Sequence, residues 1–346
     1  MAMKIRLKDV AERAGVAVNT ASTILNHRPN SWASKETEER VFKAAADLGY
    51  RPNRAAVGLR FGKFNTLALL VADLHNPYYT AFADLLGREV EKRGYDLFIE
   101  TWRSDLARER HCLVDVGDRQ VDGVAAFLSD VEPHRAFLEA QVAERRPFIA
   151  LAPVGGAALP VDSVLVEFDR GLREAVDALF TLGHRRFAFV CALAPGQSDG
   201  LRAELFGGLL KERGLNGGGF GFARCDHSIE SAYSVAKELL ARPAAKRPTA
   251  VIALNDLSAI AAMRAAVDLG LGVPAQVSIA GVDDIPFSRF LPVSLATVAQ
   301  PLGEMAAAAA ELLVGRIDQR DGDWRPPQRR VFPTKFIARE SIGPVG

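Results

Sequence analysis

The sequence predicts a small helical domain followed by a two-lobed α/β domain. Two short amphipathic helices flank a glycine within residues 7–27, an arrangement typical of a helix-turn-helix. Continuous apolar strands alternate with helices from residue 62 to 340, which indicates parallel sheets covered on both faces. Nearly 280 residues exceed what one such core holds, so we expect two Rossmann-like halves.

Composition excludes several classes of protein. Of 346 residues, 49% are hydrophobic and 25% are charged, as in an ordinary globular protein. No apolar run reaches the ~18 residues of a transmembrane helix, and the N-terminus lacks the apolar segment of a signal peptide. Cys112, Cys191 and Cys225 form no CxxC, and the histidines show no metal-ligand spacing. We therefore expect a reduced, cytoplasmic protein with no disulfide framework, metal site or cofactor.

Each of the two opening helices carries one apolar stripe at helical spacing. The stripes are Val10, Ala11 and Ala14 in the first helix, and Ala21, Ile24 and Leu25 in the second. Gly15 lies between them, where a chain that leaves a helix often needs a positive φ. The small side chain of Ala11 lets the second helix approach closely.

A third helix is expected from about residue 35 to 48. Ser34 is its expected N-cap, and Gly49 lies just beyond its end. Its expected inward face is Val41, Phe42, Ala45 and Leu48.

The outward face of the second helix carries side chains that can read DNA bases. They are Val18, Asn19, Thr20, Ser22 and Thr23. Asparagine can bond adenine with two hydrogen bonds, threonine reaches several groups, and valine contacts a thymine methyl. The first 60 residues hold 11 Lys and Arg against 6 Asp and Glu, and such a basic segment attracts polyanions. The alternative is a helical hairpin that packs on the end of another domain.

The segment GYRPNRAAVGLR, residues 49–60, predicts a short helix that folds only against a partner. Asn53 can cap it, but two turns are marginal in water and Gly58 weakens them further. Leu59 and its alanines form an apolar wedge with arginines around it, which is suited to a DNA minor groove. The alternative is a plain linker, although linkers are usually richer in Gly, Ser and Pro.

Residues 5–60 resemble the DNA-binding head of the LacI/GalR family of bacterial transcription regulators. LKDVAERAGV, TILN, ETEERV, AAADLGYRPNRAA and the closing LR match its pattern in order. The resemblance implies that the second helix reads the major groove and that the hinge helix folds on DNA with Leu59 intercalated. The DNA-contacting residues are then Val18, Asn19, Thr20, Ser22, Thr23, Asn26, Arg51, Asn53, Arg54, Ala56 and Leu59.

This head departs from the family pattern at three places. Ala17 stands where a capping serine is usual, Ala21-Ser22-Thr23 stands where Val-Ser-Arg is common, and RPNSWAS is about two residues longer than the usual loop. Because of these changes, the operator sequence cannot be copied from a relative.

The body alternates strands with helices. The expected strands are 66–73, 95–102, 123–128, 147–151, 164–168, 187–192, 220–225, 250–254 and 278–283. TLGHRRFAFV, NDLSAIAAM, VSIAGVDD and LATVAQP resemble the same family's effector domain, which is similar to periplasmic sugar-binding proteins. The resemblance therefore covers nearly the whole chain.

The resemblance also implies the domain boundaries. It places a head at 1–50, a hinge helix and linker at 51–62, and an effector-binding and dimerisation domain at 63–340. The N-lobe would comprise about 63–160 and 293–325, and the C-lobe about 161–292 and 326–340. The alanine run 306–310 would lie in a dimer-side helix of the N-lobe.

The ends of the predicted strands supply candidates for a small-molecule site. They are Asp73, Asn76, Tyr78, Tyr79, Ser198, Arg202, His227, Asn255, Asp256 and Asp283. Aromatic rings can cover apolar C–H faces of a polyhydroxylated ligand while the polar groups take its hydroxyls. The resemblance implies effector contacts for Arg202, Asn255 and Asp283.

Structural roles are the alternatives for several of these candidates. Asp256 can cap the helix that follows it, and one of the two tyrosines can belong to the core. Phe168 and Glu167 stand where relatives often have Asn and Asp, so that part of the pocket differs from the family.

The sequence also fits two other classes of protein in part. GQSDG, residues 196–200, fits the G-x-S-x-G pattern of hydrolases. However, Ala194 and Pro195 separate this motif from the preceding strand, so the turn is not the tight one of a hydrolase. The catalytic triad of a hydrolase also requires a later acid followed by a distant histidine, and the only later histidine, His227, directly follows Asp226. A periplasmic solute-binding protein would account for residues 62–340 but not for the head.

The sequence therefore predicts a DNA-binding transcriptional regulator that is not an enzyme. We expect a repressor that binds a palindromic double-stranded operator as a homodimer and is controlled allosterically by a small molecule, by default a sugar or sugar derivative. No membrane partner is expected, and the C-terminus shows no heptad for a tetramer. Whether the effector weakens or strengthens DNA binding is left open.

Overall fold

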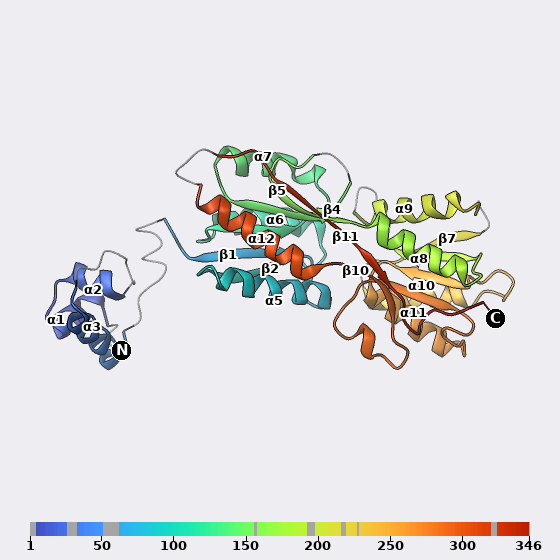
Figure 1. Ribbon diagram of the computed structural model, residues 1–346, viewed down its shortest axis with the longest axis horizontal. Helices are drawn as coiled ribbons and strands as arrows, with labels where there is room; N and C mark the ends of the chain where they lie inside the picture. The colour runs from blue at the N-terminus through green and yellow to red at the C-terminus, as the bar shows by residue number, and fades with distance from the viewer. Residues whose placement is uncertain are drawn as a thin grey trace. The chain divides into compact units, whose positions relative to one another are not determined.

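The computed structural model divides the chain into two units, Met1–Phe64 and Asn65–Gly346 (Figure 1). The residues that it describes are 5–25, 33–50, 62–155, 158–191, 198–215, 219–226, 228–319 and 324–345. Within these ranges, no helix combines the length and the apolar character that crossing a bilayer requires.

Three helices around one small core form the first unit. They are α1 (Leu7–Ala14), α2 (Val18–Leu25) and α3 (Lys35–Leu48). Gly15 ends α1 in the left-handed conformation with φ 67°, and its amide donates to the carbonyls of Ala11 and Glu12. Because Ala11 and Ala21 are both almost fully buried, α1 and α2 pack closely. The predicted helix-turn-helix is present.

The two ends of α3 lie where the sequence predicts them, whereas its buried face differs from the predicted one in one residue. The Ser34 hydroxyl accepts from the Thr37 amide at 3.3 Å, and Gly49 closes the helix with φ 66°. Phe42, expected inside, is 39% exposed, and Ala44 lies in the core in its place. Ala44 and Ala45 follow Val41 by three and four positions and share its face of the helix, whereas Phe42 is turned away from it.

The second unit begins with a six-stranded parallel sheet. Its strands, in spatial order, are β11 (Arg329–Pro333), β5 (Asp162–Glu167), β4 (Phe148–Pro153), β3 (Gly123–Phe127), β1 (Thr66–Val71) and β2 (Asp96–Thr101). Helices α5 (Pro77–Glu91) and α12 (Leu302–Ile317) cover one face. Helices α6 (Leu106–Asp118) and α7 (Arg135–Ala143) cover the other. The alanine run of α12 is largely buried here: Ala306, Ala309 and Ala310 are 0% exposed.

A second six-stranded sheet has the same construction (Figure 1). In spatial order it contains β12 (Lys335–Ile337), β10 (Ala296–Ala299), β9 (Ser278–Asp283), β8 (Ala250–Ala253), β6 (Phe187–Cys191) and β7 (Phe220–Arg224). All pairs are parallel except β12 with β10. Helices α8 (Asp169–Thr181) and α9 (Ser198–Glu212) pack against one face, and α10 (Ile229–Leu240) and α11 (Asp256–Asp268) against the other. The two-lobed α/β fold is thereby confirmed.

Strand pairing corrects the expected lobe boundaries. β5 pairs with β4 in the first sheet, so the chain first crosses to the second sheet after Glu167 and not near residue 160. β10 belongs to the second sheet, so the second crossing follows Ala299 rather than residue 292. β11 belongs to the first sheet and β12 to the second, which places the third crossing at Thr334 rather than near 325.

The crossings lie side by side. The amide and hydroxyl of Thr334 both donate to the Glu167 carbonyl, at 2.9 and 3.0 Å. A Cβ added to Gly171, in the first turn of α8, would collide with Thr334 and Val298, so only glycine permits this approach. The three connections therefore form one hinge region.

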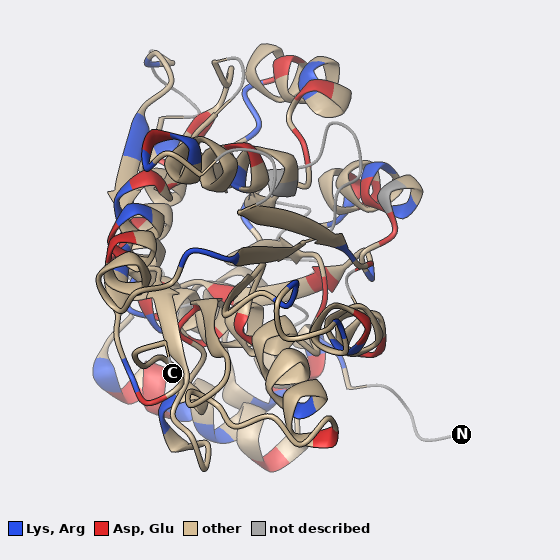
Figure 2. Cartoon of the chain, turned by 90° about the vertical axis from the view of Figure 1, so that its right-hand side faces the viewer, with Lys and Arg blue, Asp and Glu red and all other residues tan. Residues whose placement is uncertain are grey.

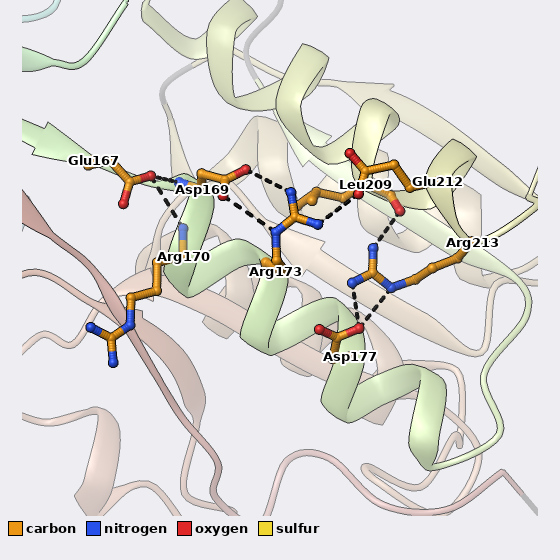
Figure 3. A network of polar contacts seen from close by, with 8 residues as sticks. All are labelled: Glu167, Asp169, Arg170, Arg173, Asp177, Leu209, Glu212 and Arg213. Atoms are coloured by element: carbon orange, nitrogen blue, oxygen red, sulfur yellow. Dashed lines mark hydrogen bonds and ion pairs between the residues drawn. The ribbon is translucent and has the colours of Figure 1, made fainter.

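Charged pairs tie α8 to α9 on the outer surface of the second sheet (Figure 3). Arg173 bonds Asp169 on its own helix and Glu212 on α9, the latter at 2.7 Å. Arg213 reaches back to Asp177 of α8. Viewed from the side of the second sheet, the helices carry interspersed basic and acidic residues, and the strands between them carry few (Figure 2). Exposed pairs of this kind orient helices more than they stabilise them.

Candidate functional site

Helix α2 presents the expected base-reading residues on its open side. Val18 is 44% exposed, Asn19 is exposed, and Thr20, Ser22 and Thr23 are half-buried. The Thr23 hydroxyl donates to the Asn19 carbonyl at 2.9 Å, so its hydrogen is used within the helix. The other predicted DNA contacts lie outside the described residues: Asn26, Arg51, Asn53, Arg54, Ala56 and Leu59.

A cavity of about 160 Å³ lies where strand ends of both sheets meet the hinge region. Sequence-predicted residues that line it are Asp73, Asn76, Tyr78, Tyr79, Arg202, Asn255 and Asp283. The structure thus brings together seven of the ten candidates, from segments far apart in the chain. Further lining residues are Trp102, Ser104, Phe127, Ser129, Phe168 and Gln300.

A chain of hydrogen bonds joins the two lobes through the cavity wall. The hydroxyl of Tyr78, on α5, donates to Gln300 Oε1 at 2.9 Å. Gln300 Nε2 donates to Asp283 Oδ1 at 2.8 Å. Gln300 directly follows β10, where the chain crosses to α12. This chain therefore spans both lobes and one crossing.

Burial controls the acid–base state of two groups in this wall. Asp283 ends β9 with φ 116° and is 5% exposed. Burial, with the nearby Asp256 carboxylate second, raises the pKa of Asp283 well above its usual value, while Arg202 and hydrogen bonds act in the opposite direction. Burial also raises the pKa of Tyr78. Burial therefore disfavours the charged form of both groups in the cavity wall.

Aromatic rings cover the rest of the cavity. Tyr78 and Tyr79 meet edge-to-face at 5.1 Å, and both contact Phe127 in the same way. Across the cavity, the Arg202 guanidinium lies 5.1 Å from the centre of the Phe168 ring and donates to the Leu254 carbonyl at 3.1 Å. Such rings pack on apolar C–H faces, and the guanidinium donates to oxygen atoms.

Two predicted residues act partly or wholly as structural groups. Asn255 caps α11 through Oδ1, which accepts from the Ser258 amide at 2.8 Å, so its amide nitrogen is the group left to face the cavity. Asp256 is 0% exposed and does not line the cavity. Its carboxylate accepts from Ile285, Ser288 and Thr297 at 2.6–2.9 Å. The expectation that Asp256 contacts the ligand is therefore corrected: it anchors the loop after β9, and burial raises its pKa to about 6.

Of the remaining candidates, His227 lies outside the described residues, and Ser198 begins α9 with its side chain outside the described part. Four polar or aromatic residues that line the cavity were not predicted from the sequence: Trp102, Ser104, Ser129 and Gln300. Trp102, Ser104 and Ser129 follow strands as closely as the candidates chosen, so the same strand-end rule could have found them. Gln300 also directly follows a strand, β10, but that strand was not among the expected ones.

Comparisons with known proteins agree with this architecture. A family model described as bacterial regulatory proteins, lacI family, matches residues 6–53, and one described as a periplasmic binding protein-like domain matches residues 176–342. The HTH-type transcriptional regulator DegA of Bacillus subtilis is 30% identical over 99% of both chains. The chain belongs to the LacI family of bacterial regulators.

Other relatives extend the comparison of this LacI-family protein. The ribose operon repressor of Haemophilus influenzae is 27% identical over 97% of this chain and 98% of its own. A structure of a CelR–cellobiose complex is 27% identical, with a TM-score of 0.68 and coverage of 97% and 99%. A Lac repressor dimer bound to operator and an anti-inducer has a TM-score of 0.82 over 98% and 99% at 22% identity, which supports the fold alone.

Family membership settles the class of function. The protein is a DNA-binding transcriptional regulator with a ligand-binding type of second domain, and it is not an enzyme. The hydrolase alternative built on GQSDG is thereby dismissed, as is the periplasmic alternative, which left the head without a role.

Proposed function

We propose that the protein is a cytoplasmic repressor that binds a palindromic operator as a homodimer and is controlled by a neutral polyhydroxylated effector in the cavity between the lobes. The cavity carries this proposal. Its aromatic rings and its mixed donors and acceptors suit sugar C–H faces and hydroxyls. Asp73, Asn76, Tyr79, Arg202, Asn255 and Asp283 are the proposed effector contacts.

The hinge region supplies a route from effector to DNA. Phe168 and Gln300 line the cavity and stand at two of the three crossings. An effector that bonds both lobes stabilises one angle between them, because it gains contacts only when the lobes are correctly placed. In a dimer, that angle sets the spacing of the two heads. The coupling free energy between effector binding and DNA binding in allosteric proteins is typically about 1–3 kcal/mol.

Two named relatives favour a sugar and a repressing role. One is a repressor of a ribose operon, and the other was solved with cellobiose. A symmetric dimer matches two recognition helices to two half-sites one helical turn apart.

Selection from random DNA duplexes tests the DNA-binding part. The full chain should enrich a palindrome at one stated salt concentration, and an Asn19→Ala variant should lose it or change one base position. Enrichment of no sequence at any salt concentration would refute the proposed operator binding.

Thermal unfolding with D-ribose, D-glucose and cellobiose tests the effector part. At least one sugar should raise the melting temperature of the wild type and change the affinity for the selected duplex. Arg202→Met should weaken the binding of that sugar by about tenfold, because the substitution removes charged hydrogen-bond donors from the cavity. Exposed Arg330→Met serves as the matched control and should leave the sugar's affinity unchanged.

A further inference from the structure

One cavity residue, Ser129, has both of its hydrogen-bond donors committed behind the cavity wall. Ser129 follows β3 by two residues, is half-buried and lines the cavity. Its amide donates to Glu109 Oε1 at 2.8 Å, and its hydroxyl bonds Glu109 Oε2. Glu109 comes from α6, so the contact joins two elements behind the wall.

Glu109 is a completely buried carboxylate whose partners are all donors. It is 0% exposed. Besides Ser129, it faces His134 Nε2 at 3.4 Å. His134 is 4% exposed, and its Nδ1 is buried without a hydrogen-bond partner among the described residues. A proton on Nδ1 would be buried and unsatisfied, so the ring proton belongs on Nε2, where it faces the carboxylate.

This arrangement fixes the polarity of the Ser129 hydroxyl. A serine has one hydroxyl hydrogen and two lone pairs, and the Ser129 hydroxyl donates to Glu109 Oε2. The single hydrogen is therefore directed to Glu109, and only lone pairs of Ser129 Oγ remain for the cavity. A hydroxyl group free to rotate would accept or donate with equal ease; this one cannot.

We propose that Ser129 is a specificity-determining residue of the effector cavity that accepts a hydrogen bond from one ligand hydroxyl, with Glu109 and His134 as its positioning residues. The inference rests on the proposed neutral polyhydroxylated effector and adds a rule for one of its groups. The ligand atom that faces Ser129 must carry a hydrogen. A deoxy, ether, carbonyl or fluoro group at that position is rejected, because it leaves Oγ unpaired or sets acceptor against acceptor.

Fluorinated sugars test this rule, because fluorine replaces a hydroxyl with little change of size but cannot donate. The probes are D-ribose, D-glucose and cellobiose with their monodeoxyfluoro derivatives, titrated against the full chain by calorimetry. For the wild type, fluorine at one position should weaken binding by roughly tenfold or more relative to the parent sugar.

Two substitutions should remove that penalty by different routes. Ser129→Ala deletes the acceptor, so the parent sugar weakens by about tenfold while fluorine at the same position costs about threefold or less. Glu109→Gln places an amide donor against Ser129 Oγ and turns the serine hydrogen into the cavity. The fluoro sugar should then bind more tightly than it does to the wild type. As a control, Ser163→Ala, which alters a buried serine of β5 outside the cavity, should leave the affinity loss of each fluoro sugar relative to its parent unchanged.

The outcomes separate the two proposals. If no parent sugar binds the wild type, the proposed effector class fails, and the role of Ser129 fails with it. If a parent sugar binds but the fluorine penalty at every position is the same in wild type, Ser129→Ala and Glu109→Gln, only the role of Ser129 is overturned. A merely structural Glu109 would lower affinity for all sugars alike, and that result also counts against the proposal.

Discussion

Replacing Arg316 by methionine should destabilise the second unit more than any surface substitution. Arg316, near the end of α12, is 3% exposed and forms a two-point pair with Asp162, at 2.6 and 2.8 Å. It also donates to the carbonyls of Arg325 and Pro326, at 2.6 and 3.1 Å. The backbone amide of Gln328 donates a further hydrogen bond to Asp162 Oδ1, at 2.6 Å. One guanidinium thus fastens the chain that leads from α12 into β11.

The expected loss follows from what the methionine leaves behind. Asp162 is 1% exposed, and its nearest remaining cation would be Arg325 at 3.7 Å. Breaking one side of a buried ion pair costs about 3–5 kcal/mol, since the other charge stays buried without compensation. For a unit of this size, a loss of ~4 kcal/mol corresponds to a melting temperature lower by roughly 7 °C.

Urea unfolding followed by far-ultraviolet circular dichroism measures this loss. The control is Arg330→Met, which removes an exposed pair with Glu311 at 3.4 Å and should cost less than ~1 kcal/mol. The double variant Arg316→Met with Asp162→Leu should cost clearly less than the sum of its single variants, because no lone charge remains buried. A loss below ~1 kcal/mol for Arg316→Met would show that this reasoning about the buried pair is wrong.

Further predictions concern pH, packing and the separation of the two units. Burial lowers the pKa of His184 below its usual 6.5, so as the pH falls the unfolded chain is protonated at this residue before the folded chain is. The free energy of unfolding, measured with urea, should therefore fall as the pH drops below about 6.5, and His184→Gln should flatten that dependence. In Gly281→Ala, the new Cβ meets the Asp256 carboxylate and Cα, so calorimetry should show a loss of about 2–3 kcal/mol. Gly208→Ala, at an exposed position of α9 with open space around it, should instead gain about 0.5–1 kcal/mol, and equal effects of the two substitutions would contradict the packing argument. Ala21→Leu overfills the fully buried core of the head, so anisotropy with the selected duplex should show lost binding while sugar binding persists; unchanged DNA affinity would count against a tightly packed head.

Local chemistry let the sequence predict the elements of both units. Gly15, Ser34 and Gly49 act through hydrogen bonds to residues within four positions, so a short window contains the whole signal. The alternation of apolar strands and helices likewise predicted two parallel sheets, because a strand buried on both faces reads as a continuous apolar run. Strand ends then pointed to seven residues that the fold gathers around one cavity.

Long-range contacts decided what the sequence could not. β5 reads as an ordinary buried strand, and nothing in its residues says which sheet it joins; its pairing with β4 assigns it to the first sheet. β11 was not among the expected strands, because most of its residues are exposed, and only its pairing with β5, more than a hundred residues earlier, places it in the same sheet. Asp256 looked like a ligand contact until Ile285, Ser288 and Thr297 enclosed it. Ser129 gave no hint of its fixed polarity, because that depends on a carboxylate twenty residues earlier that becomes its neighbour only when α6 packs behind β3. By itself, the sequence determined the helices of the head with their caps, the strands β1 to β9 and the family pattern, but not the strands β10, β11 and β12. Only the tertiary structure decided the crossings and the direction of each buried polar group, because these depend on partners that folding brings together.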